Sequence, residues 1–229
     1  MRRVMHHHRH FEEGTALVAD SSQFAADSSL DLPGSSLGRF LALPARAITI
    51  NWVTVGDPGN AADTAGSPNP ANAVAAAFQI MKFETTNAQY VDFLNSVAAT
   101  DTYSLYNANI GTNARGGITQ TGSSGGYTYA VRTSMGDKPV NYVTWFSVAR
   151  MANWLHNGAT GTSSTETGAY TLVGGQTSGT VPARNPNALA YVPTEDEWYK
   201  AAYYKGGGTN AGYWHYRADA HFMPGFAGL

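Results

Sequence analysis

Cysteine, charge and long apolar runs are scarce in this chain, and each shortage excludes a class of protein. The 229 residues contain no cysteine, which excludes disulfides, thiolate metal sites and a cysteine nucleophile. Charged residues make up only 13%, about half of the ~25% typical of soluble domains. No apolar run approaches the ~20 residues of a membrane helix. A net charge of −2 without a basic stripe argues against nucleic-acid partners.

Glycine and aromatic residues are abundant instead. The chain has 25 Gly, 13 Tyr and 5 Trp, and 43% of its residues are hydrophobic, which is enough for a core. A length of 229 residues fits one large domain, or one domain with tails. Because polar, loop-rich and aromatic compositions are common outside the cytoplasm, we predict an extracytoplasmic or secreted protein.

Residues 1–47 differ from the rest and are predicted to be a disordered or misassigned N-terminal tail. They contain little periodicity beyond a charged start with four histidines, His6, His7, His8 and His10. A histidine cluster can bind a transition metal, but a charged terminus is the preferred interpretation. Ala45-Arg46-Ala47 follows the pattern of an export-signal cleavage site, so the end of this tail is compatible with a remnant of such a signal.

Several stretches after residue 47 have the composition of short strands. Residues 48–55 alternate and are rich in β-branched side chains, and 77–83 follow a polar loop. Residues 116–132 indicate a hairpin with Tyr127, Tyr129 and Val131 on one face. Further strands are predicted within 168–175 and 188–193, between segments rich in turn residues.

Three helices are predicted from capping signals that precede apolar periodicity. Thr86 with Gln89, and Thr194 with Glu197, have the spacing of a capping box, and Thr144 is a third N-cap. Glu195, Asp196 and Glu197 form an acidic run that could indicate acid/base catalysis. Because negative charge in the first turn suits the helix dipole, we interpret the run as capping. Few helices, many short strands and long loops predict an α+β fold.

Four ordered segments carry a resemblance to a known family. They are "FQIMKFETTNAQYVDFLNSV", "KPVNYVTWFSVARMANWLHNG", "ETGAYTL" and "YVPTEDEWYKAAYYKGGG". Their motifs, Glu84 to Tyr90, Pro139 to Trp145 and Val192 to Trp198, resemble those of the sulfatase-modifying-factor, or formylglycine-generating-enzyme, family over about residues 48–216. The resemblance implies a loop-rich fold similar to C-type lectins, with calcium sites. In enzymatic members it also implies oxidation of a sulfatase cysteine to formylglycine with copper on a cysteine pair.

The sequence departs from this family pattern in its C-terminal part. Cysteines and the later tryptophan-rich motifs are absent, so residues 48–229 are predicted to be a domain of bacterial type that lacks its C-terminal part. Cu(I) needs soft ligands, and the spacing of His215, His221 and Met223 does not indicate a substitute site. No calcium ligand can be assigned either. We therefore predict a non-catalytic or fragmentary member with no assignable cofactor; the alternatives are a lectin-like binding module and a purely structural domain.

The segment 206–216 is the most site-like stretch of the chain. Its glycines allow a tight loop, and Tyr213, Trp214 and Tyr216 are predicted to form a stacking surface for a peptide or glycan. The competing interpretation is that these aromatics pack in the core. Trp145, Trp154 and Trp198 are predicted to be core residues, and Asn87 and Asn141 to satisfy backbone groups of loops.

Overall fold

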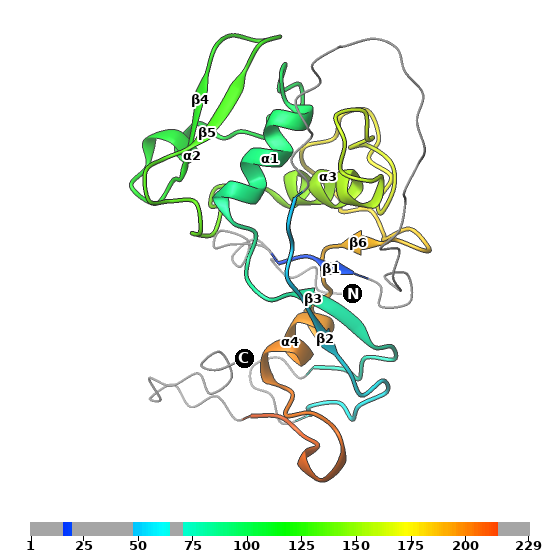
Figure 1. The fold of residues 1–229 in the computed structure, drawn as a ribbon. Coiled ribbons are helices and arrows are strands. Elements are labelled where there is room, and N and C mark those ends of the chain that lie inside the picture. Colours follow the sequence, from blue (N-terminus) through cyan, green and yellow to red (C-terminus); the bar gives the residue numbers. More distant parts are fainter. Residues whose placement is uncertain (1–15, 20–47, 65–70, 215–229) are drawn as a thin grey trace, which may run out of the picture. The chain divides into compact units, whose positions relative to one another are not determined.

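The computed structural model describes residues 16–19, 48–64 and 71–214, and these divide into two compact units. Unit 1 comprises the described residues of Met1–Thr54 and Phe78–Val192, and unit 2 those of Val55–Ala77 and Pro193–Leu229. Figure 1 shows the elements of both. The composition did not predict this division. The tail and domain boundary at residue 47 stays a prediction, because most of 1–47 lies outside the described residues.

The helices of unit 1 begin where the capping signals predict. Helix α1 (Asn87–Val97) has the complete capping box of Thr86 and Gln89. Helix α3 (Trp145–His156) begins after Thr144, whose hydroxyl accepts the backbone N–H of Ser147. A short helix, α2 (Ala108–Thr112), was not predicted from the sequence. Its Asn107 cap and five-residue length give little periodic signal.

The main sheet of unit 1 contains four strands in the order β2-β3-β1-β6. They are β1 (Val18–Ala19), β2 (Trp52–Val55, whose last residue falls in unit 2), β3 (Phe78–Met81) and β6 (Ala190–Tyr191). Strands β2, β3 and β6 lie within the predicted stretches. Strand β1 lies inside the segment predicted to be disordered, and no pattern there indicated it.

A separate hairpin confirms the prediction for 116–132. Strands β4 (Ile118–Thr121) and β5 (Thr128–Val131) pair antiparallel, with Gln120 opposite Tyr129. Tyr129 is buried, whereas Thr128 and Ala130 are exposed, which matches the predicted alternation. Figure 1 shows the hairpin standing beside α2 and α1.

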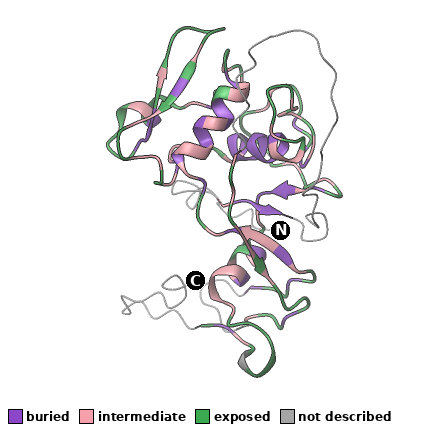
Figure 2. Ribbon diagram, in the orientation of Figure 1, coloured by how far each residue is buried: buried purple, intermediate pink, exposed green. Residues whose placement is uncertain are grey.

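The core of unit 1 is apolar and lies around α1 and α3. The Phe93 ring lies 5.5 Å from that of Tyr90 and 5.4 Å from that of Trp154, measured between centroids. All residues of α3 from Phe146 to Trp154 are buried, and Figure 2 shows this helix almost uniformly purple. Trp154 is thus a core residue as predicted, and Trp145 is half-buried.

The predicted strand within 168–175 is wrong. This segment is an irregular loop that side chains, rather than a neighbouring strand, hold in place. The Asn153 amide accepts the backbone N–H of Tyr170 at 2.8 Å and donates to the carbonyl of Thr165 at 2.7 Å. Asparagine also holds other loops: Asn87 donates to the carbonyl of Met135 and Asn141 to that of Arg115, as predicted for these two residues.

Unit 2 is built around helix α4 (Glu195–Tyr203) and a single 3₁₀ turn, η1 (Gly208–Asn210). The Thr194–Glu197 capping box is present, which confirms the capping interpretation of Glu197. The helix ends at Tyr203, three residues before the predicted glycine stop. Prediction of Trp198 as a core residue is wrong, because its side chain is 48% exposed. The buried residues of α4 are instead Glu197 and Lys200.

Candidate functional site

The predicted binding segment of unit 2 is held in a hairpin-like loop. Tyr204 and Tyr213 form an antiparallel bridge. The backbone N–H of Lys205 donates to the carbonyl of Gly212, and that of Trp214 to the carbonyl of Tyr203. Gly212 has a φ of 119°, a conformation that side-chain-bearing residues rarely adopt. The glycines noted in the sequence therefore close this loop.

Tyr213 is anchored in the interior of unit 2. Its hydroxyl accepts a hydrogen bond from the side-chain amide of Asn60 at 2.6 Å and donates to the carbonyl of Ala61 at 3.0 Å. The Asn60 amide oxygen in turn accepts the backbone N–H of Val74. Tyr213 thus connects the loop to 60–74, and its surface for a ligand is small.

Trp214 is the predicted site residue that the structure leaves accessible. Its side chain is 49% exposed, and the Lys205 ammonium lies 4.9 Å from the centre of its ring. A cation at this distance is attracted by the ring quadrupole. Tyr216 lies outside the described residues. A binding role for Tyr213, Trp214 and Tyr216 stays a prediction.

Five aromatic rings of unit 2 contact one another in sequence, and we call them the aromatic cluster. Consecutive centroids are 6.0, 4.8, 5.5 and 5.1 Å apart along the series Trp198, Tyr203, Tyr199, Tyr213 and Tyr204. The exposed indole of Trp198 stands at one end. Tilted and edge-on contacts at these separations are favourable beyond the area that they bury.

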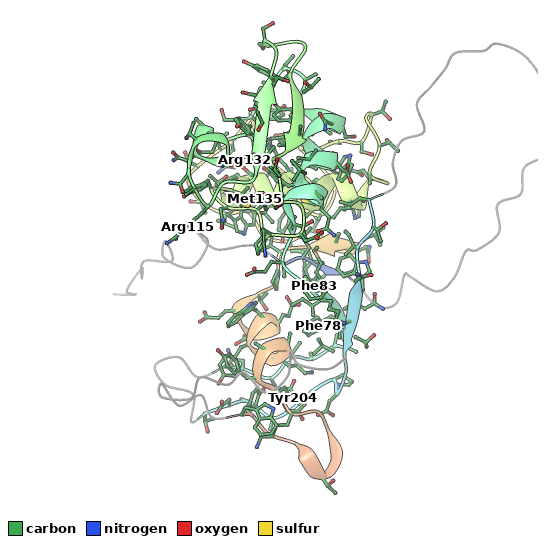
Figure 3. The ribbon with its side chains drawn as sticks, turned by 60° about the vertical axis from the view of Figure 1, so that its left-hand side comes forward. Phe78, Phe83, Arg115, Arg132, Met135 and Tyr204 are labelled. Atoms are coloured by element: carbon green, nitrogen blue, oxygen red, sulfur yellow. The ribbon has the colours of Figure 1, made fainter. Side chains whose placement is uncertain are left out.

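Two carboxylates from the 57–63 loop bind the phenols of this cluster. The Tyr204 hydroxyl donates to the carboxylate of Asp57, and the Tyr199 hydroxyl donates to that of Asp63 at 2.7 Å. The hydrogen bond to Asp57 is the main cause that raises the pKa of Tyr204 to about 12. Burial, followed by the bond to Asp63, raises the pKa of Tyr199 to about 12. Figure 3 labels Tyr204 in unit 2.

Lysine and glycine complete the surroundings of Asp57. The buried ammonium of Lys200 donates to the backbone carbonyl of Asp57 at 2.7 Å, and burial lowers the pKa of Lys200. A Cβ on Gly207 would lie 2.9 Å from the Asp57 carboxyl carbon, so only glycine fits there without movement. The carboxylate is therefore enclosed by groups that already bind it.

The remaining acids of α4 have structural partners. The Glu197 carboxylate accepts the backbone N–H of Thr194 at 2.8 Å. Asp196 accepts the backbone and side-chain N–H groups of Asn72 at 2.8 and 3.2 Å. These bonds account for the two carboxylates without an acid/base role.

Unit 1 contains a separate hollow of about 580 Å³ beside a buried ion pair. The Arg150 guanidinium donates to both carboxylate oxygens of Glu166, at 2.6 and 2.8 Å. It also lies 4.2 Å from the centre of the Tyr103 ring. One guanidinium nitrogen, Nη1, is buried without a hydrogen-bond partner. The hollow is lined by Thr102, Tyr103, Glu166, Leu172, Gly174 and Gly175.

The sequence analysis missed both the carboxylates of the aromatic cluster and this ion pair. Asp57 and Asp63 precede their tyrosine partners by more than 130 residues. Arg150 was read only as part of a helical motif. Tyr199, Tyr203 and Tyr204 do share one helical surface in the sequence, and that spacing was the one available signal.

Comparison with known proteins identifies one family. A family model described as "Sulfatase-modifying factor enzyme 1-like domain" matches residues 48–225. No curated protein and no solved structure gave a significant match. Within the described ranges, no helix has the length and apolar character needed to cross a membrane, and no three His, Cys, Asp or Glu side chains gather as metal ligands.

Proposed function

The chain belongs to the sulfatase-modifying-factor family, and we propose that it is a ligand-binding member that does not oxidise its ligand. The copper site of the family's enzymes, which the resemblance implied, requires a pair of cysteines. None of the 229 residues is a cysteine, and histidine or carboxylate side chains do not offer Cu(I) equivalent soft ligands. His215, His221 and Met223 lie outside the described residues. The residues present therefore do not fit this metal, and we derive no oxidation step.

The ligand surface that we propose is centred on Trp214 in unit 2. The half-exposed indole of Trp214 carries this proposal. Backbone bonds on both sides of its loop fix its position, so little side-chain or loop entropy is lost when a ligand stacks on it. Lys205 beside the ring adds three N–H donors. A flat apolar face next to hydrogen-bond donors suits a carbohydrate ring, whose apolar face is bordered by hydroxyl oxygens.

Two broader parts of the proposal depend on the same reasoning. A C-type-lectin-like arrangement of the domain would agree with carbohydrate binding. An extracytoplasmic location, which the low charge content favours, would place the domain where glycans are exposed. Cell fractionation with an antibody against the chain measures the location, and recovery in the cytoplasmic fraction alone would contradict it.

The binding proposal is tested with a glycan array and fluorescence titration. Labelled full-length protein is applied to the array, and each positive glycan is titrated against intrinsic tryptophan fluorescence. Trp214→Ala should weaken binding about tenfold or more, since one aromatic contact contributes on the order of 1 kcal/mol or above. Phe83→Ala is the matched control, because Phe83 is an exposed aromatic of unit 1 at 59%. An empty array, or equal losses in both variants, contradicts the proposal, and binding only to a peptide library supports the peptide alternative.

The absence of oxidation is tested separately. Copper-loaded protein is incubated with oxygen, a thiol reductant and a cysteine-containing sulfatase peptide, and aldehyde formation is followed by mass spectrometry. No aldehyde is expected above the level of copper alone. Protein-dependent aldehyde would overturn the non-catalytic assignment while leaving the glycan result unaffected.

A further inference from the structure

Strand β1 occupies an interior position of the main sheet although it lies outside the family match. The match begins at residue 48, whereas β1 comprises Val18 and Ala19. The strand order β2-β3-β1-β6 means that β6 reaches the sheet only through β1. Figure 1 shows the blue β1 next to β6, although the two are far apart in sequence. A segment from outside the matched domain thus completes the domain's sheet.

The contacts of β1 run along both of its edges. Val18 stands opposite Ile80 of β3 and Tyr191 of β6, and Ala19 stands opposite Gln79 and Ala190; both pairings are antiparallel. The carbonyl of Leu17 extends the first pairing by accepting the backbone N–H of Met81 at 3.0 Å. Two edges of backbone groups are therefore satisfied by the same short segment.

The walls of this position are apolar and exclude water. Leu17, Val18 and Ala19 are each 0% exposed, and the flanking Phe78, Met81, Ala190 and Tyr191 are buried. Without β1, the facing backbone groups of β3 and β6 would lose their partners in a buried setting, which is unfavourable. The position consequently favours an occupant that is extended, apolar and small.

We propose that the space between β3 and β6 is a peptide-acceptor slot, occupied in this chain by its own residues 16–19. Strand addition of this kind obtains affinity from main-chain hydrogen bonds and specificity from the pockets for alternate side chains. A segment this short binds weakly by itself, but its covalent link gives an effective concentration on the order of millimolar. The occupant is thus exchangeable for an extended segment of similar sequence, Leu-Val-Ala, from another chain.

The sequence places a cleavage-like pattern between the occupant and the rest of the domain. Ala45-Arg46-Ala47 lies after β1 and before β2 in the chain. Cleavage there would convert the tethered strand into a separate peptide. The slot would then lose the advantage of the tether and become available to another segment.

A protease site inserted after Gly34 in the full-length chain tests the slot. A fluorescent peptide with the sequence of residues 15–20 is added before and after cleavage, and its anisotropy is measured. The intact chain should bind negligibly and the cleaved chain saturably, and the same peptide carrying Asp at the Val18 position should not compete. A cleaved chain that fails to bind the peptide, or that unfolds, overturns an exchangeable slot.

Hydrogen exchange at Met81 gives a second readout in the uncut chain. Val18→Asp should speed exchange of this amide about tenfold or more, because the local opening free energy falls, and added wild-type peptide should restore protection. Val18→Ala should have a smaller effect in the same direction and serves if the aspartate variant does not fold. Unchanged protection of Met81 in both variants would mean that residues 16–19 do not hold β3, contrary to the proposal.

Discussion

Unit 1 and unit 2 differ in what they bury. Unit 1 buries a continuous set of apolar side chains on α1, α3 and the sheet, whereas the described part of unit 2 buries only Ala71, Val74 and Tyr213 among its hydrophobic residues. Helix α4 buries Glu197 and Lys200 and exposes Trp198. Figure 2 shows the contrast between the purple α3 and the largely pink and green α4.

This difference assigns different sources of stability to the two units. Burial of apolar surface contributes roughly 25 cal/mol per Å², and it dominates where such surface is abundant, as in unit 1. Unit 2 depends more on hydrogen bonds between tyrosines, carboxylates and asparagine, each of which contributes about 1 kcal/mol net. Unit 1 should therefore respond mainly to lost volume, and unit 2 to lost hydroxyls and to pH.

The largest effect is expected from truncation of the unit 1 core. Phe93→Ala removes a ring that is 0% exposed and contacts Tyr90 and Trp154. A buried Phe→Ala change costs about 3–5 kcal/mol, which chemical denaturation would measure as a lower midpoint. Phe83→Ala, at an exposed position labelled in Figure 3, should stay within about 0.5 kcal/mol. Similar losses for both variants would contradict an apolar core around α1.

A slightly smaller effect is expected from the buried ion pair of unit 1. Glu166→Leu leaves the fully buried guanidinium of Arg150 without its counter-ion, which costs about 3 kcal/mol. Arg150→Met should cost less, because the Glu166 side chain is 23% exposed and can be hydrated. Denaturation of the double variant should give a stability near wild type. Additive losses in the double variant would mean that the two side chains do not act as a pair.

Local signals in the sequence predicted the elements of both units well. The Thr86–Gln89 and Thr194–Glu197 capping boxes depend on residues three apart, so the pattern and the structure coincide. The hairpin of 118–131 was equally predictable, because its alternation is set by the two strands themselves. Where an element depends on neighbours close in sequence, the prediction holds.

Elements set by distant partners could not be predicted. Strand β1 exists because β3 and β6 flank it, and neither is near it in the chain. Segment 168–175 has strand-like composition but obtains its backbone partners from Asn153 and Asn185 side chains. Trp198 occupies a helix position that periodicity assigned to a core, yet unit 2 places Lys200 in its interior instead. Tertiary context overrode the local pattern in all three cases.

The candidate site was predictable only in its exposed member. Aromatic residues in a glycine-rich loop indicated Trp214 as a surface group, and the structure leaves it half exposed. Tyr213 carries the same local signal, but Asn60 and Ala61 bind its hydroxyl from a loop about 150 residues earlier. Composition alone does not distinguish a presented ring from an anchoring one.

A moderate effect is expected when unit 2 loses one buried hydroxyl. Tyr213→Phe removes the acceptor of the Asn60 amide and the donor to Ala61, at a cost of about 1–2 kcal/mol. Hydrogen exchange should increase in peptides from 193–214 and remain unchanged in peptides from α3. Tyr203→Phe, which keeps the ring at the centre of the aromatic cluster, is the matched control. Faster exchange in α3 alone would contradict the assignment of this bond to unit 2.

The smallest effect is absent at neutral pH and develops in alkali. The folded state keeps Tyr204 protonated up to a pKa of about 12, whereas the unfolded chain releases this proton near pH 10. Between these values the unfolded state binds fewer protons, so stability is complete below pH 10 and declines as the pH rises toward 12. Asp57→Asn removes the carboxylate that causes the shift and should return one tyrosine toward pH 10 in a tyrosinate absorbance titration. Tyr129 in unit 1, whose pKa of about 12 arises first from burial, should titrate unchanged. If both tyrosines shifted together, the two units would not be independent in the way that their buried residues indicate.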